Sequence, residues 1–196
     1  GLRDLRERRQ IGPQRWIGIG AAGSPSVQVP GRFLRAAPTA LPLGTDAVDG
    51  IALLLALPVL PDLDAVFAEL RRVLRPGGTL VVVVPSASPS SWGELRLAPM
   101  LRPVHRAWTH RSALDRAGWL LAAADFAVLG DDRAPFAIPL PDPTVARQLA
   151  DRLPAAGLWP PDLPDAVRVD VVAGLARRTG PGRVLPIPLR RLVARR

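Results

Sequence analysis

The stretch DLDAVFAELRRVLRPGGTLVVVV, Asp62 to Val84, decides the fold that the sequence predicts. Asp62 is a suitable helix N-cap residue. The apolar side chains after it recur with a helical period and form one stripe: Leu63, Val66, Phe67, Leu70, Val73 and Leu74. A Pro-Gly-Gly turn at residues 76–78 ends the helix, and the apolar run Thr79 to Val84 is typical of a strand buried on both faces. We therefore expect a helix over residues 62–74 and a strand over 79–84.

A second apolar run, Gly50 to Ala56, precedes this helix. Strand, helix and strand in this order indicate a right-handed crossover in a doubly wound α/β sheet. Further upstream, Arg15 to Ile19 and Arg32 to Arg35 are expected to be strands, and Leu2 to Arg9 a short charged helix. The predicted fold class is therefore α/β.

The secondary structure of the chain after Val84 is less clearly indicated by the sequence. Residues 113–125 predict a helix despite Gly118, and Phe126 to Leu129 a strand. Because prolines punctuate Ala134 to Pro143, we expect a link there that ends the regular fold. It would separate an α/β domain, residues 1–133, from an extension, residues 134–196, with two helices. These helices are expected at Pro143 to Leu153 and Asp165 to Arg178.

Composition excludes several classes of protein. The chain has 196 residues, of which 48% are hydrophobic and 22% charged, as in a globular domain. It has no cysteine, which rules out disulfides and thiolate metal sites, and we expect no metal. The net charge of +9 comes from arginines spread along the chain, which does not favour a nucleic-acid face. The longest apolar run, Gly50 to Leu60, is far shorter than the roughly 20 residues of a membrane span, so a cytoplasmic protein is expected.

The central segment carries a family resemblance. Leu41 to Pro85 resembles the centre of the class I S-adenosylmethionine-dependent methyltransferases of the small-molecule type. That family has an LPF-x-D-x-x-F-D stretch before its fourth strand, an LPD loop after it, and a helix ending in L-[RK]-PGG. The matching residues here are Leu41-Pro42-Leu43, Asp46, Asp49, Leu60-Pro61-Asp62 and Leu74 to Gly78. The resemblance implies a Rossmann-like methyltransferase sheet.

The match to this family also bears on the spacing Gly18-x-Gly20-x-x-Gly23, which has the form of a dinucleotide-binding turn. The eight residues between Gly23 and Arg32 include two prolines, too few for a helix and a strand. We therefore assign Arg15 to Ile19 to the family's second strand and regard the glycine match as accidental. The family's first strand and glycine-rich loop are then expected before Gly1, so that the chain is an N-terminally truncated fragment.

The resemblance also implies which positions would bind the cofactor, S-adenosylmethionine. The family's ribose-binding acid falls on Gly20, and its adenine-binding acid and following amide fall on Ala37 and Pro38. These residues lack a side-chain acceptor or, for proline, an N–H group, so cofactor binding is expected to be weak or absent. Asp46 and Asp49 are the alternative ligands, although capping of the loop before the next strand is the simpler interpretation.

On the substrate side, the resemblance places Leu57 and Pro58 after the fourth strand, and Ser86 and Trp92 in a small-residue loop after the fifth. A general-base role for His110 is weighed against a structural one, and no catalytic residue is assigned. The expected function is methyl transfer to an unknown small molecule. The alternative is a non-catalytic interaction module that has lost cofactor binding. The arginine-rich tail, residues 183–196, is read as a docked segment rather than a binding surface for acidic partners, and the oligomeric state stays open.

Overall fold

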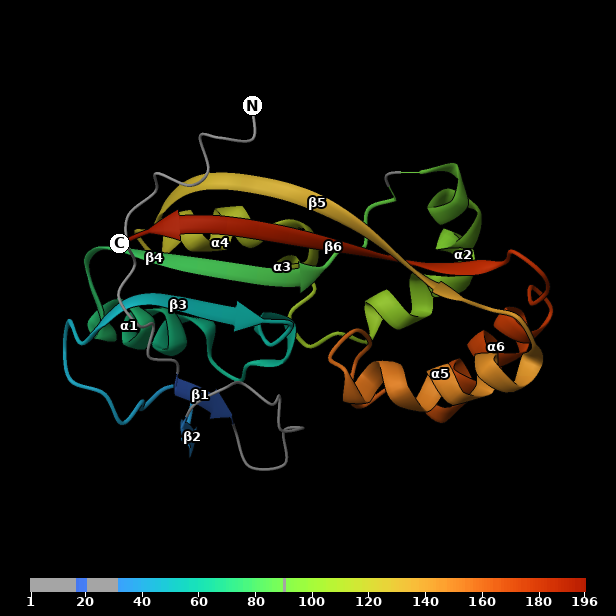
Figure 1. Ribbon diagram of the computed structural model, residues 1–196, viewed down its shortest axis with the longest axis horizontal. Helices are drawn as coiled ribbons and strands as arrows, with labels where there is room; N and C mark the ends of the chain where they lie inside the picture. The colour runs from blue at the N-terminus through green and yellow to red at the C-terminus, as the bar shows by residue number, and fades with distance from the viewer. Residues whose placement is uncertain (1–16, 21–31, 90) are drawn as a thin grey trace, which may run out of the picture.

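The computed structural model describes residues 17–20, 32–89 and 91–196. Its main sheet has four strands in the order β3 (Val48–Leu54), β4 (Leu74–Pro85), β6 (Val184–Arg195) and β5 (Ala127–Pro139), as Figure 1 shows. β3 and β4 are parallel, whereas β6 is antiparallel to both of its neighbours. A separate parallel pair is formed by β1 (Ile17–Gly20) and β2 (Arg32–Arg35). The expected α/β class with a Rossmann-like sheet is confirmed.

The predicted crossover is present between β3 and β4. Helix α1 (Leu63–Val73) begins after Asp62, whose carboxylate accepts a hydrogen bond from the amide of Ala65 at 3.0 Å. The helix ends where Leu74 turns to an extended conformation, with ψ of 126°. β4 therefore starts at Leu74 rather than at Thr79, because the Pro-Gly-Gly segment is already extended.

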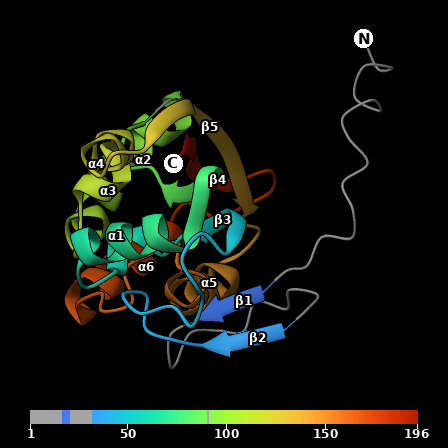
Figure 2. The same ribbon diagram turned by 90° about the vertical axis from the view of Figure 1, so that its left-hand side faces the viewer.

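The first hydrophobic core lies between the sheet and three helices, α1, α3 (Ser112–Asp115) and α4 (Ala117–Ala123). Figure 2 shows these helices together on one side of the sheet. Fully buried side chains of β4 and β6 meet them: Leu80, Val82, Val84, Leu192 and Ala194. The single helix expected over residues 113–125 is two helices that break at Arg116.

A second core lies where β5 and β6 extend past the other strands. It is formed with α2 (Trp92–Arg106), α5 (Pro143–Ala155) and α6 (Asp165–Ala176), which gather at one end of the molecule (Figure 1). The two C-terminal helices agree closely with the predicted ones. A short 3-10 helix, η1 (Leu57–Val59), follows β3.

The structure differs from the link expected over Ala134 to Pro143. β5 continues to Pro139 and pairs with β6 along its whole length, so the expected division at residue 134 falls inside a strand. Prolines are tolerated here because β5 is an edge strand, where an N–H group need not reach a neighbour. The arginine-rich tail is β6, which lies between β4 and β5.

The glycine spacing has no counterpart in the main sheet. Gly18 and Gly20 lie in β1, which pairs in register with β2 and with no strand of the four-stranded sheet among the described residues. This agrees with β1 and β2 being consecutive parallel strands outside the centre. Gly23, the expected helix over Leu2 to Arg9 and the expected absence of an earlier strand lie outside the described residues.

Candidate functional site

The loop after β4 leads directly into helix α2. Ser91 caps this helix, since its hydroxyl accepts a hydrogen bond from the amide of Glu94 at 3.2 Å. Ser91 and Glu94 have the spacing of a capping box, a common start signal of helices. The cap fixes where α2 begins and places Glu94, which is buried, in its first turn.

A cavity of about 40 Å³ lies under this loop. One face of α2 lines it, because its lining residues recur at steps of four, three and four: Glu94, Ala98, Leu101 and His105. The other walls are the loop itself, the segment after α5 and the first half of β6: residues 85–89, Leu158, Trp159 and residues 185–188. The lining is largely apolar, with a carboxylate, an imidazole and serine hydroxyls as its polar groups.

The cavity lies near the carboxyl ends of β3 and β4. Leu55, directly after β3, donates its amide to the carbonyl of Val83 at 2.7 Å. Its φ of 57° is unusual for a residue other than glycine. Gly157 packs against Leu55, and the next two residues line the cavity. Ligands of open α/β sheets bind at the carboxyl ends of strands, so this cavity is the candidate site.

Asp115 of α3 holds the loop in place. Its carboxylate accepts hydrogen bonds from the Ser86 hydroxyl at 3.4 Å and from the Ser88 amide at 3.2 Å. Arg133 donates to the carbonyl of Ser88 at 2.8 Å, and the amide of Ser86 donates to Pro188 at 2.9 Å. The loop is thus tied to α3, β5 and β6.

The two histidines have different surroundings. Burial lowers the pKa of His105, and the negative charge of Asp115 opposes this shift. His105 is therefore neutral at pH 7 and able to accept a proton. The Nε2 atom of His110 donates to the carbonyl of Leu60 at 2.6 Å, and its amide donates to Pro58 at 3.0 Å. His110 thus joins the backbone around η1 instead of lining the cavity.

Of the four substrate-side residues expected from sequence, only Ser86 lines the cavity. Leu57 belongs to the first core, Pro58 next to it in the chain is also buried, and Trp92 is 80% exposed at the start of α2. Sequence reasoning missed Glu94, His105 and Trp159. The capping box and the stripe along α2 could have revealed the first two, whereas Trp159 is brought in by tertiary packing.

The three positions expected to face the cofactor carry no polar side chain. Gly20 ends β1 opposite Arg35. Ala37 and Pro38 follow β2 in a tight turn, in which the amide of Ala40 donates to the carbonyl of Ala37 at 3.1 Å. The residues present therefore do not fit the nucleoside part of S-adenosylmethionine at these positions.

The two alternative ligands, Asp46 and Asp49, lie at the amino end of β3, opposite the end that leads to the cavity. Asp46 forms an ion pair with Arg196, and Asp49 forms one with Arg75. Both carboxylates therefore have arginine partners within the protein.

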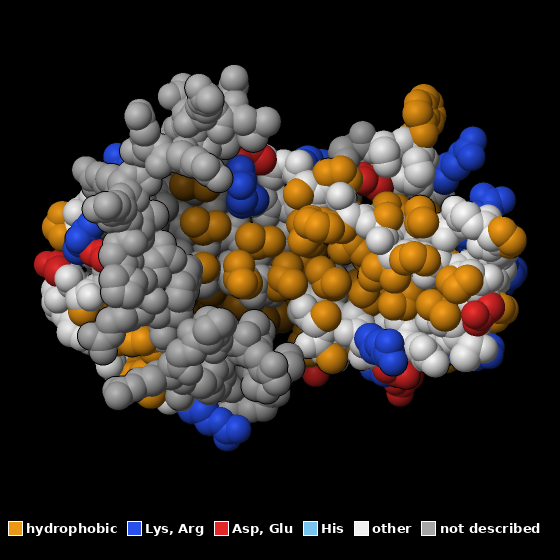
Figure 3. Space-filling model, in the orientation of Figure 1, with side chains coloured by type: hydrophobic (Ala, Val, Ile, Leu, Met, Phe, Trp, Pro, Cys, Tyr) orange, Lys and Arg blue, Asp and Glu red, His pale blue; other side chains and the backbone are white. Residues whose placement is uncertain are grey.

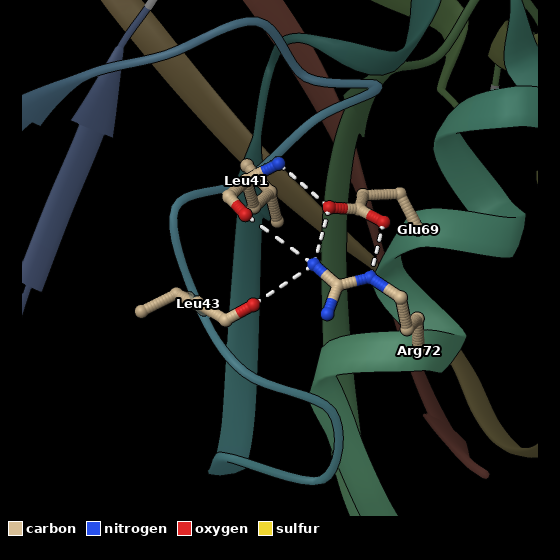
Figure 4. A network of polar contacts seen from close by, with 4 residues as sticks. All are labelled: Leu41, Leu43, Glu69 and Arg72. Atoms are coloured by element: carbon tan, nitrogen blue, oxygen red, sulfur yellow. Dashed lines mark hydrogen bonds and ion pairs between the residues drawn. The ribbon is translucent and has the colours of Figure 1, made fainter.

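The resembling segment is held to α1 by a polar network, which Figure 4 shows. Glu69 is buried and accepts the amide of Leu41 at 2.6 Å and the guanidinium of Arg72 at 2.7 Å. Arg72 also donates to the carbonyls of Leu41 at 3.3 Å and Leu43 at 2.9 Å. The hydrogen bond from Arg72 lowers the pKa of Glu69, against the effect of burial. The network fixes the path of the chain between β2 and β3.

Residues 17–20, 32–89 and 91–196 contain no group of three or more His, Asp or Glu side chains suited to a metal ion. In the same residues, every helix is too short or too polar to cross a membrane.

Residues 20–82 match the family model described as a methyltransferase domain. No curated protein matches the sequence. Among solved structures, a Bacillus halodurans C-125 protein assigned as a methyltransferase is similar with a TM-score of 0.52 and 14% identity, over 84% of this chain and 71% of that one. YcgJ from Bacillus subtilis gives a TM-score of 0.48 and 16% identity, over 84% and 69%. The [4+2]-cyclase SpnF gives 0.47 and 21%, over 84% and 55%.

The fold is therefore that of the Rossmann-like class I methyltransferases. The match to the methyltransferase-domain family model covers residues 20–82, about a third of the chain. This segment includes the β3-α1-β4 crossover from which the fold was predicted. It stops before the cavity-lining part of the chain, so the family match and the cavity are independent observations.

Proposed function

We propose that the protein is an S-adenosylmethionine-dependent methyltransferase that acts on a small molecule. The family match over residues 20–82 supports the reaction class. The observation that supports a small-molecule methyl acceptor is the cavity near the carboxyl ends of β3 and β4. Its lining is mainly apolar, and Glu94 and His105 are its titratable groups. Such a lining suits an apolar molecule with one hydroxyl or amine.

His105 is the residue that we propose to accept a proton from the acceptor group. Its pKa is lowered by burial, so the neutral imidazole prevails near neutral pH. The cavity of about 40 Å³ holds water molecules but not a whole substrate, so a substrate must displace part of its wall. The loop over residues 86–89 carries the small side chains of that wall.

We expect this chain to bind the cofactor weakly. Because Gly20, Ala37 and Pro38 supply no side-chain acceptor and Pro38 no amide donor, we propose a dissociation constant for S-adenosylmethionine weaker than about 1 mM, or about 4 kcal/mol of binding. Titration calorimetry on the 196-residue chain tests this value. A micromolar constant would contradict it and would point to contacts elsewhere in the protein.

The same three positions favour a second candidate, a methyltransferase-like interaction module without cofactor binding. A transfer assay separates the two candidates. The chain is mixed with labelled S-adenosylmethionine at several millimolar and a panel of small alcohols and amines. Transfer that falls in His105→Gln but persists in His110→Gln supports the enzyme and the cavity. Complete absence of transfer across the panel favours the module.

A further inference from the structure

Helix α2 has an exposed side opposite the one that lines the candidate cavity. Four apolar side chains recur on this side at steps of three and four residues and therefore form one row along the helix: Trp92, Leu95, Pro99 and Pro103. Trp92 is 80% exposed and Leu95 is 49% exposed. Single exposed apolar residues are common on protein surfaces, but a continuous row of them on one helix marks a surface for interaction.

Exposed arginines border this apolar row on both sides. At the helical spacing, Arg96 lies along one edge of the row, and Arg102 and Arg106 lie along the other. Among the described residues none of these three arginines forms an ion pair, whereas Arg190 and Arg191 of β6 each pair with an aspartate. We call the apolar row and its three arginines the outer face of α2.

The outer face lies at one end of the molecule. Figure 1 shows α2 at the end where the second core is formed. Figure 3, in the same orientation, shows a hydrophobic side chain that projects from this part of the surface, with basic side chains beside it. The one acidic residue of α2, Glu94, is buried and lines the cavity. The outer face is therefore apolar along its middle and positive along its edges, and it carries no acidic side chain.

We propose that the outer face of α2 binds an anionic membrane surface. Helices that lie at a membrane interface combine Trp or Leu with arginines in this way. Trp92 and Leu95 enter the boundary between headgroups and acyl chains, while the guanidinium groups stay at the level of the lipid phosphates, because the long arginine side chains reach back to the polar region. The helix then lies in the plane of the surface, with its cavity-lining side turned toward the protein.

Charge and shape favour a lipid surface over two other partners. A second copy of the chain would bring a net charge of +9 and the same three arginines, so repulsion opposes its association. An acidic protein would pair with the arginines, but it would also have to match the projecting row of side chains between them, because stable protein interfaces need shape complementarity. A fluid lipid surface adapts to that row.

Sedimentation with lipid vesicles tests the proposal and does not depend on methyl transfer. The 196-residue chain is mixed at low salt with vesicles of phosphatidylglycerol and phosphatidylcholine in equal parts, or of phosphatidylcholine alone. We expect binding to the anionic vesicles to be stronger by more than about tenfold. Each arginine near an anionic surface contributes about fivefold in affinity, so Arg102→Gln with Arg106→Gln should weaken binding by about 25-fold. Trp92→Ala should weaken it by about fivefold, since the ring is only partly buried in lipid.

Each variant has a matched control on another helix. Arg147→Gln with Arg152→Gln removes the same charge from exposed positions of α5. Trp119→Ala removes a tryptophan that is 68% exposed on α4. We expect both controls to bind the anionic vesicles as the wild type does. Equal losses in the controls and in the outer-face variants would overturn the proposal, because they would show attraction by net charge alone.

Two other results would also overturn the proposal. Failure of the wild-type chain to sediment with anionic vesicles would exclude a membrane partner. Unchanged binding in Trp92→Ala, together with full competition by polyglutamate, would assign the outer face to an acidic protein. Circular dichroism checks that each variant is folded, and Leu95→Gln takes the place of Trp92→Ala if that variant is not.

Discussion

The substitution Glu69→Gln tests the network that ties the resembling segment to α1. The glutamine retains an oxygen for the amide of Leu41, which now donates to the Glu69 carboxylate at 2.6 Å. It loses the negative charge and turns an NH₂ group toward Arg72, whose two bonds to Glu69 are both 2.7 Å. The variant therefore weakens charge-assisted hydrogen bonds and turns one donor toward another.

The magnitude follows from these contacts. A hydrogen bond to a charged group contributes about 1.5 to 3 kcal/mol, and the 36% exposure of the Arg72 side chain reduces that value through solvent screening. We expect a loss of about 1 to 1.5 kcal/mol in the free energy of unfolding. For a domain of this size the melting temperature would fall by about 2 to 6 °C.

The effect must also depend on pH. The pKa of Glu69 is lowered in the folded protein, first by its hydrogen bond to Arg72. Its stabilisation is thus fully present above the unfolded value of 4.5 and is lost as pH falls through the folded value. The difference between wild type and Glu69→Gln should be largest at neutral pH and should shrink in acid.

Urea unfolding followed by tryptophan fluorescence, at pH 7 and in steps toward pH 3, measures both quantities. Asp170→Asn is the control, because Asp170 is an exposed carboxylate on α6 away from the network. A loss below about 0.3 kcal/mol at pH 7, or one that is equal at both ends of the pH range, would refute the reasoning.

Three further outcomes are expected. Because burial lowers the pKa of His105, its midpoint in an NMR titration should lie below 6.5. The free energy of unfolding should therefore rise with pH between the folded pKa and 6.5. Loss of this rise in His105→Gln would show that it comes from His105. Gly157→Ala should lose about 1 to 3 kcal/mol by urea denaturation, since φ is 71° and the new Cβ lies 3.1 Å from that of Leu55. Asp62→Ala should lose about 1 kcal/mol in the same assay, because the amide of Ala65 loses its cap; an unchanged midpoint in either variant contradicts these contacts.

The candidate site was only partly predictable. Ser86 lines the cavity and follows directly on a strand whose end could be read from its apolar run, whereas its role toward a substrate stays a prediction. Leu57 and Pro58 also follow a strand, yet η1 turns them into the core, where they are buried. His105 joins the site because α2 brings it to the same cavity as Trp159, which lies 54 positions further along the chain.

The sequence by itself determined the β3-α1-β4 unit, because its signals are local. The cap at Asp62, the apolar stripe and the Pro-Gly-Gly turn each act within a few residues, and the two strands at its ends are apolar throughout. Only the tertiary structure decided that residues 184–195 lie between β4 and β5. The β4–β6 pairing joins segments more than 100 residues apart along the chain. Prolines at four positions of β5 and β6 mask the strand pattern: Pro135, Pro139, Pro186 and Pro188. Local propensity carries no information about which distant strand supplies the missing hydrogen bonds, so the sheet order and the cavity beside it follow from packing alone.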